Sequence, residues 1–278
     1  MLKITQINIY PVKSLDGFSP SSAIVEGRGL QYDRRWMIVG EDGVFFSQRT
    51  QRKMTHLCAR IDNQQLVIEE KNNLINKIAV GLEEMTDEIQ VSVWDDTVLA
   101  KKVSTLADDF LSDFLGVKCH LVKMPNEAKR RVEEEYNTGD DVVSFADGYP
   151  FLIIGEASIN DLNTRLETPL NAENQALVGM RRFRTNFVFS GGEPYEEENW
   201  SDFKIGKIAF QGMKPCGRCV MTTLNPDTGE RGNEPLRKLA EYRKVGNKIP
   251  FGQNLIWKED FSEGNIISIG DLINKENI

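Results

Sequence analysis

Two cysteines three positions apart are the most chemically specific feature of the sequence. Cys216 and Cys219 flank Gly217 and Arg218, and they make up half of the four cysteines in the chain. A Cys-x-x-Cys pair is typical of a zinc site, of a dithiol redox centre, or of one soft-metal thiolate ligand beside a second, uninvolved thiol. Each of these chemistries needs different neighbours, so the other residues can discriminate between them.

The zinc and dithiol alternatives find little support in the sequence, although both stay open. A structural zinc site has four ligands, so two more would have to come from carboxylates or from Cys58, Cys119, His56 and His120. A dithiol centre places its first cysteine at the N-terminus of a helix, which lowers the pKa of the thiol. The β-branched residues at 220, 222 and 223 instead predict a strand over 220–224.

The third chemistry joins one thiolate on a soft metal to cations that meet an anion beside it. The sequence holds such cations close to the ends of predicted strands, where polar groups converge on a cleft. These candidates are Lys13 with its neighbour Ser14, Arg34, the run RRFR at 181–184 that ends in Arg184, and, at the cysteine pair itself, Lys214 and Arg218. Taken singly, each is equally typical of an ordinary surface, so their meaning depends on whether the fold gathers them.

The elements that must position these residues are mostly short strands. Turn-separated strands are predicted at 4–12, 22–26, 36–39, 57–61, 66–69, 89–93 and 98–101, a spacing typical of a barrel. A helix is predicted over 104–115, because its apolar residues share one face, with Gly116 as the C-cap.

The second half of the chain is again mostly β. Strands are predicted at 151–154, 186–189, 207–210, 220–224, 254–257 and 266–269, and helices at 157–166 and 235–243. The charged segment 123–141 predicts a solvated loop or lid. We therefore expect an α+β class, mostly β with a few helices. Two domains are expected, with a β-rich N-terminal domain at 1–118 and a second domain at 119–278.

Composition excludes several classes of function. The 278 residues are 40% hydrophobic and 27% charged, with no apolar run long enough for a membrane helix. A net charge of −8 argues against binding a nucleic-acid polymer, which needs a basic face. The first ten residues alternate apolar and polar side chains, unlike a signal peptide, so a cytoplasmic protein with reduced thiols is expected.

Eight short segments carry a resemblance to a known family. In order they are YPVKS at 10–14, DRRW at 33–36, Asp147 with PFLI at 150–153, EAS at 156–158, FRTN at 183–186, CGRCVMTT at 216–223, PDTG at 226–229 and FGQN at 251–254. They cover nearly the whole chain. The sequence resembles the MOSC family (molybdenum cofactor sulfurase C-terminal domain), near the branch of the mitochondrial amidoxime-reducing component.

The resemblance implies a fold and a site. A MOSC β-barrel would pack on the β-rich N-terminal domain, with a molybdenum-molybdopterin cofactor (Mo-MPT) in the cleft between them. The second cysteine of the pair, Cys219, would be both the metal ligand and a catalytic residue. Asp147 would be catalytic, delivering a proton or orienting a water, with capping of a turn as its alternative. The cofactor contacts implied by the family positions are Lys13, Ser14, Arg34, Gly148, Arg184, Asn186 and Arg218.

The implied reaction is the two-electron reduction of a small N-hydroxylated substrate, such as an amidoxime, a hydroxylamine or an N-hydroxylated base. Some bacterial relatives carry a further ferredoxin-like domain, whereas no cysteine follows Cys219 here. Electrons are therefore expected from a separate flavin, haem or iron–sulfur protein. Two alternatives stay open: a sulfur carrier or cofactor-handling module that uses a Cys219 persulfide, and a non-catalytic barrel with a zinc clip.

Overall fold

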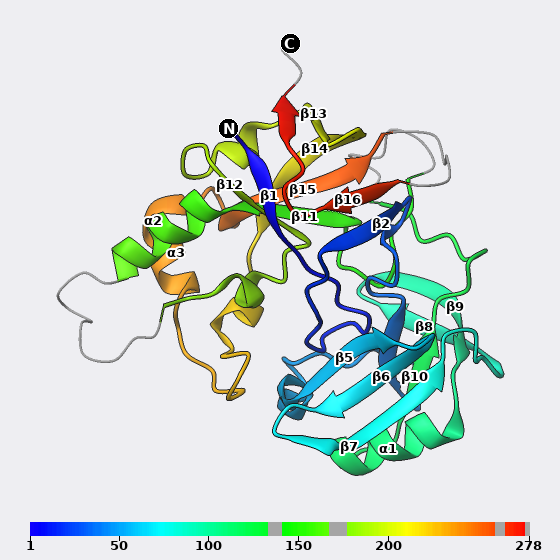
Figure 1. Cartoon of the computed structure of the whole chain (residues 1–278). Coiled ribbons are helices and arrows are strands. Elements are labelled where there is room, and N and C mark those ends of the chain that lie inside the picture. The colour runs from blue at the N-terminus through cyan, green and yellow to red at the C-terminus, as the bar shows by residue number, and fades with distance from the viewer. Residues whose placement is uncertain (133–140, 167–176, 259–264, 276–278) are drawn as a thin grey trace.

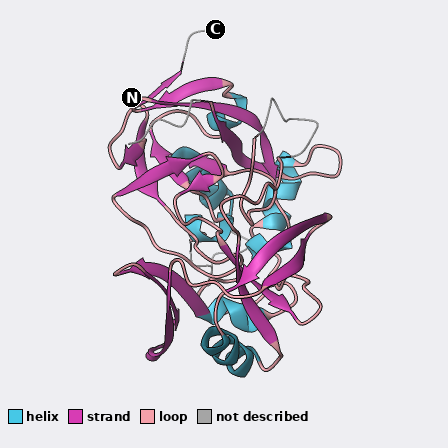
Figure 2. Ribbon diagram, turned by 90° about the vertical axis from the view of Figure 1, so that its right-hand side faces the viewer, coloured by secondary structure: helices cyan, strands magenta, loops and turns pink. Residues whose placement is uncertain are grey.

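The computed structural model describes residues 1–132, 141–166, 177–258 and 265–275. Strands dominate these residues, and three α-helices accompany them (Figure 1). The predicted class, mostly β with a few helices, is confirmed. Figure 2, turned by 90°, shows strands both above and below the centre of the molecule, with helices at its side and base. No helix among the described residues is long and apolar enough to cross a membrane.

A seven-stranded sheet forms the larger part of the molecule. Its strands, in spatial order, are β1 (Lys3–Ile7), β12 (Phe187–Ser190), β11 (Phe151–Gly155), β15 (Pro250–Trp257), β14 (Ile208–Gly217), β13 (Asp202–Ile205) and β17 (Ile273–Lys275). The two edges of this sheet approach each other, because Lys3 bridges Leu272 and the Ile273 N–H donates to the Leu2 carbonyl. The sheet therefore nearly closes into a barrel, which leaves little unpaired edge.

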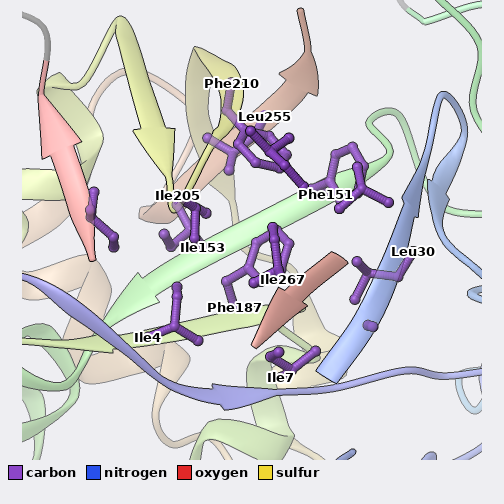
Figure 3. Close-up of a cluster of buried hydrophobic side chains, with 14 of the residues drawn as sticks. Ile4, Ile7, Leu30, Phe151, Ile153, Phe187, Ile205, Phe210, Leu255 and Ile267 are labelled. Atoms are coloured by element: carbon purple, nitrogen blue, oxygen red, sulfur yellow. The ribbon is translucent and has the colours of Figure 1, made fainter. Parts of the chain in front are cut away.

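The barrel interior is a continuous apolar core. Figure 3 shows Phe151, Ile153 and Phe187 of the central strands meeting Ile4 of the first strand and Leu255 of β15. All five side chains are essentially buried. Burial of each such side chain stabilises the fold by about 1.5–3 kcal/mol, so this core contributes strongly to the stability of the barrel.

The other half of the molecule holds two further sheets and a helix. A four-stranded sheet consists of β4 (Trp36–Gly40), β10 (Cys119–Lys123), β9 (Asp96–Lys102) and β8 (Glu88–Val93), and a three-stranded sheet of β5 (Leu57–Asp62), β6 (Gln65–Glu70) and β7 (Asn73–Gly81). Helix α1 (Thr105–Leu115) begins with the Ser104 hydroxyl accepting from the Ala107 N–H and ends at the left-handed Gly116. Both caps are local sequence signals, so this helix was predictable.

The remaining elements are short. Strands β2 (Ser22–Glu26), β3 (Gly29–Leu30) and β16 (Ile266–Ser268) form a third small sheet. Helices α2 (Glu156–Leu166) and α3 (Leu236–Arg243) contribute to a separate core cluster that also contains Phe183 and Phe251. The 3-10 helices are η1 (Arg52–His56), η3 (Met180–Phe183), η4 (Glu196–Asn199) and η5 (Val220–Thr223).

The sheets exchange strands between the two halves of the sequence. Strand β1 belongs to the barrel sheet and pairs with β12, and β2 pairs with the late strand β16. Strand β10 begins after residue 118 but pairs with β4 and β9 of the first half. The division into 1–118 and 119–278 stays a prediction. The exchange means that both halves of the chain share one framework.

Three sequence-based predictions are wrong in detail. The first strand ends at Ile7 rather than at residue 12. The segment after Cys219 is the 3-10 helix η5, and the strand β14 precedes the cysteine pair instead. Packing thus overrides the β-branched preference at 220–223. The charged segment 123–141 is not a solvated loop at Arg130 or Val132, which are buried; its residues 133–140 lie outside the described part.

Candidate functional site

An open cavity of about 150 Å³ is lined by residues from both halves of the chain. All nine residues named from the sequence line this cavity: Lys13, Ser14, Arg34, Asp147, Gly148, Arg184, Asn186, Arg218 and Cys219. The fold therefore gathers residues as far apart in the sequence as Lys13 and Cys219, while the role of each stays a prediction.

The two cysteines of the pair have different surroundings. Cys216 lies near the end of β14, half-buried against the cluster of α2 and α3. Cys219 is solvent-exposed and directly precedes η5, where its carbonyl accepts from the Thr222 N–H at 3.1 Å. The tight turn after Cys219 ends the extended backbone and leaves this thiol open to the cavity. The pair is therefore unequal.

Arg218 occupies the space between the cysteine pair and the neighbouring loop. Its Nη1 donates to Cys216 Sγ at 3.0 Å, and its Nη2 donates to the Phe183 carbonyl at 2.7 Å. Its Nε is buried and has no hydrogen-bond partner among the described residues. An unsatisfied buried donor costs about 1–3 kcal/mol, so this guanidinium is suited to a ligand that brings an acceptor.

Two further guanidiniums lie over one tyrosine ring. The Arg34 and Arg184 carbons Cζ are each 4.4 Å from the centroid of Tyr10, and Arg34 Nη2 donates to the Arg184 carbonyl at 2.8 Å. The fully buried Asp33 pairs with Arg34 and accepts from the Tyr10 N–H at 2.8 Å. Burial, together with the charge of Arg34, lowers the pKa of Arg184. Asp33 pairs directly with Arg34, whereas Arg184 feels Asp16 and Asp33 only through space, so this site can take an added anion.

Several lining residues have a left-handed backbone. Ser14, Arg34, Arg184 and Trp94 have φ values of 67°, 49°, 54° and 55°. Non-glycine residues rarely adopt this region, because the Cβ crowds the backbone. Such strain is typical of binding sites, where surrounding contacts determine the backbone conformation. The turns that present these side chains to the cavity are therefore held by the fold.

A lysine and an aspartate form the polar floor of the cavity. Lys13 Nζ donates to Asp147 Oδ1 at 2.7 Å and to the Phe145 carbonyl at 2.8 Å, and Trp94 Nε1 donates to the same Asp147 oxygen at 3.0 Å. Lys13 is buried, whereas 76% of the Asp147 side chain is accessible from the cavity. Asp147 Oδ2 has no hydrogen-bond partner among the described residues, so it can meet a ligand.

The electrostatics of this pair follow from its position. Burial lowers the pKa of Lys13, and the charge of Asp147 offsets part of that shift. Enclosure by the cavity walls would raise the pKa of Asp147, but Lys13, the Trp94 N–H and Arg34 outweigh it and hold that pKa well below its ordinary range. At neutral pH the pair is therefore an ammonium and a carboxylate.

Arg130 fixes the loop that carries Asp147. Its guanidinium donates to the carbonyls of Ser144 and Asp147 at 3.0 and 2.7 Å, while its Nε pairs with Asp96 at 2.7 Å. Asp96 begins β9, directly after the turn that presents Trp94. One buried arginine thus ties the Asp147 loop to the β8–β9 hairpin. The sequence missed this residue because it lies within a run of charges.

Asn186 and Gly148 line the cavity in different ways. The Asn186 Oδ1 accepts from the Leu152 N–H at 3.2 Å, and its Nδ2 donates to the Asn8 carbonyl at 3.2 Å. Its amide therefore joins strand ends of the barrel. Gly148 follows Asp147 at the cavity wall. A contact of either residue with a cofactor stays a prediction.

Other lining residues were not found from the sequence. They include Phe45, Ser47, Arg49, Trp94 and Tyr149. Trp94 offered one usable signal, because it is a large aromatic residue between the predicted strands at 89–93 and 98–101. The others lie in loops whose paths depend on tertiary contacts.

Among the described residues, the cysteine pair lacks the further ligands that a structural zinc site needs. No group of three or more His, Cys, Asp or Glu side chains that could hold a metal is found within the described ranges. Four protein ligands are usual for structural zinc. The zinc alternative therefore gains no support from this part of the chain.

The fold and the cavity define a β-barrel protein of a known class, and comparison with family models gives the class its name. The MOSC N-terminal beta barrel domain matches residues 1–118, and the MOSC domain matches residues 140–274. The chain belongs to the MOSC family.

Curated relatives fall into two groups. The molybdenum cofactor sulfurase of Homo sapiens is 30% identical over 99% of this chain, which spans 32% of that protein. The chain thus spans about a third of the sulfurases that it matches. The mitochondrial amidoxime-reducing component 1 of Mus musculus is 30% identical over 96% of this chain and 80% of its own length. Among solved structures, the YUAD protein from Bacillus subtilis covers 98% of this chain with a TM-score of 0.43 and 9% identity.

Proposed function

We propose that this protein binds Mo-MPT and reduces small N-hydroxylated compounds. The observation that carries the proposal is the cavity itself, which joins an exposed thiol at Cys219, the guanidiniums of Arg184 and Arg218, and the charged pair of Lys13 and Asp147. The likeness to an amidoxime-reducing component over most of both chains supports the reaction class.

The residues present fit this cofactor. Cys219 supplies the single thiolate that a soft metal would take, and metal ligation would keep that thiol deprotonated. Arg34, Arg184 and Ser14 would hold the terminal phosphate, because guanidinium groups bind phosphate through paired hydrogen bonds. The unsatisfied Nε of Arg218 would meet a further acceptor of the pterin.

When bound, the cofactor would supply the two electrons that cleave an N–O bond. The chain would bind the substrate in the open part of the cavity, with its N–OH group near Asp147 Oδ2. Lys13 Nζ would provide the proton, because burial lowers its pKa and makes the ammonium a better acid. The low pKa of Asp147 keeps its carboxylate ionised, so Oδ2 would accept a hydrogen bond from the N–OH group and orient it, while Oδ1 holds the Lys13 ammonium in place.

The electrons would come from a separate donor protein, with a flavin, a haem or an iron–sulfur cluster. A cytoplasmic location, with neither a membrane nor a nucleic-acid partner, remains part of the same proposal. The net charge of −8 would suit docking of a donor through a basic patch.

Reduction of benzamidoxime by an artificial electron donor tests this function. The protein is purified from a host that makes molybdopterin, and benzamidine is measured by chromatography. We expect turnover that depends on the donor and is lost in Cys219→Ala. A molybdenum-loaded protein that reduces neither benzamidoxime nor a hydroxylamine would contradict the proposal.

The sulfur-carrier function is the second candidate. It is favoured by the exposure of Cys219 and by the likeness to molybdenum cofactor sulfurases. Mass spectrometry of the intact chain separates the two functions. A sulfane-sulfur adduct on Cys219 in protein without molybdenum would support the carrier, whereas stoichiometric molybdenum supports the reductase.

A further inference from the structure

One wall of the cavity is aromatic and basic, and it comes from the N-terminal half of the chain. We call it the Trp94 wall, made of Phe45, Arg49 and Trp94. The rings of Phe45 and Trp94 meet edge to face with centroids 5.0 Å apart, and Arg49 Cζ lies 4.3 Å from the Trp94 centroid. Trp94 is 42% exposed, so its ring keeps surface open to the cavity.

The positive charge of Arg49 is available to a ligand. Its side chain is exposed and has no carboxylate or hydrogen-bond partner among the residues that the structure describes, whereas its guanidinium lies over the Trp94 ring. A guanidinium stacked on an aromatic ring is held in place while its N–H groups stay available at the edge. Arg49 is therefore ordered for binding without being neutralised.

The cavity as a whole carries more positive charge than one terminal phosphate requires. The described lining residues include a single carboxylate, that of Asp147, which is paired with Lys13. The other lining cations are Arg34, which is paired with the buried Asp33, and Arg49, Arg182, Arg184 and Arg218. In a chain of net charge −8, this concentration of positive charge marks a place for more than one anionic group.

The contacts divide these cations into two groups. Arg34 and Arg184 are joined through Tyr10 and a direct hydrogen bond, on the side assigned to the cofactor phosphate. Arg49 is joined through the Trp94 ring to Asp147, on the side assigned to the N–OH group. Arg49 therefore faces the place assigned to the substrate.

We propose that the Trp94 wall is a substrate subsite that selects planar N-hydroxylated compounds bearing an anionic group. The planar part packs on the Trp94 ring, the anionic end pairs with Arg49, and the N–OH group reaches Asp147. The inference rests on the proposed function for its reaction but makes its own claim about affinity. Carboxylates and phosphates share the chemistry that Arg49 recognises.

Tryptophan fluorescence measures binding at this wall directly. The other three tryptophans, Trp36, Trp200 and Trp257, are 1%, 6% and 8% exposed, so quenching by a ligand reports on Trp94. Holo protein without an electron donor is titrated with 4-carboxybenzamidoxime and with benzamidoxime. We expect the carboxylated compound to bind about tenfold more tightly, the size of one partly screened charge-assisted contact. Trp94→Phe should remove the signal.

Two variants make the test specific. Arg49→Gln should lose most of the preference for 4-carboxybenzamidoxime while its affinity for benzamidoxime stays unchanged. Arg52→Gln removes the same charge from an exposed residue outside the cavity lining and should keep the wild-type preference. The ratio of kcat/KM for the two compounds should follow the affinities. A phosphate-bearing analogue and free inorganic phosphate, used as competitors, show whether phosphate is accepted as well as carboxylate.

Two results would overturn the subsite. One is equal affinity of the wild type for both compounds, or equal losses for both in Arg49→Gln. The other is a lower pterin content in Arg49→Gln, which would assign Arg49 to the cofactor. Selective quenching without turnover of either compound would instead contradict the proposed reaction and leave the binding claim standing.

Discussion

The side of the cavity that carries Asp147 and the side that carries Cys219 differ in how many contacts the protein makes to their functional groups. On the proton side, the side chain and loop of Asp147 are held by Lys13, Trp94 and Arg130, with distances of 2.7–3.0 Å. On the thiol side, Cys219 is exposed, and its sulfur has no partner among the described residues. Contacts within the protein hold Lys13 and Asp147, which are charged without a ligand, whereas Cys219, the residue assigned to the metal, is left without a contact.

The physical cost of leaving each group unpaired explains this difference. A buried ammonium such as that of Lys13 costs several kcal/mol without a partner, so its carboxylate must be present from the start. An exposed thiol is weakly polar and costs little without one. Cys219 can therefore stay without a partner until a metal binds, whereas Lys13 and Asp147 must form their ion pair when the protein folds.

The largest expected effect separates the two cysteines. Cys219→Ala should abolish N-hydroxy reduction and lower the molybdenum content to background, because it removes the single thiolate ligand. Cys216→Ala, the matched control, should largely keep both, since Cys216 is half-buried and contacted by Arg218. Turnover and metal analysis measure this. Equal losses in the two variants would refute the inequality of the pair.

The next effect concerns the proton side. Asp147→Asn should lower kcat about a hundredfold, a usual size for losing general acid–base help, while the molybdenum content stays unchanged. The charge of Asp147 raises the pKa of Lys13. Its removal should lower that pKa further, so the alkaline limb of the pH–rate profile should move to lower pH. An unmoved limb would remove Lys13 from the proton path.

Substitution in the cluster of Arg34 and Arg184 should have a smaller effect, and the effect should be on retention of the pterin. Arg34→Ala removes one charge-assisted contact, worth roughly 1.5–3 kcal/mol, so retention of the pterin should fall about tenfold or more. Pterin content after dialysis, measured by fluorescence after oxidation, checks this. The thermal midpoint controls for folding, because Arg34 also holds the Arg184 carbonyl. Unchanged pterin content in a folded variant would exclude the role.

The smallest effect tests whether the proton side is positioned from a distance. Arg130→Gln should lower kcat about tenfold with KM little changed, because the Asp147 loop loses its tie to Asp96. Arg130→Lys should rescue little, since an ammonium cannot reproduce the fork of contacts. If Arg130 has a merely structural role, the variant should show a lower thermal midpoint and an unchanged pH–rate profile of the remaining activity. If Arg130 positions Asp147, the pH–rate profile should shift.

Local signals made part of this fold predictable. Helix α1 follows from an apolar face with Ser104 and Gly116 at its ends, and β2 follows from alternation over Ser22–Glu26. The gathering of all nine predicted site residues in one cavity follows from the family motifs rather than from local pattern. Motif order conveys long-range information that periodicity lacks.

Long-range contacts account for what the sequence hid. The β-branched residues after Cys219 favour a strand, but they form η5, whose Thr222 and Thr223 are buried by packing. Arg130 is buried by its bonds to carbonyls of the Asp147 loop, which a run of charges does not reveal. Trp94 reaches the cavity through a hairpin turn with positive φ. Each depends on neighbours distant in sequence.

Molybdenum and pterin content of the purified protein tests the central claim most directly. The chain is expressed in a host that makes molybdopterin, and both quantities are measured per chain alongside zinc and sulfane sulfur. The account predicts close to one molybdenum and one pterin per chain, both lost in Cys219→Ala and retained in Cys216→Ala. Zinc bound at the cysteine pair, or a persulfide on Cys219 without molybdenum, would contradict it.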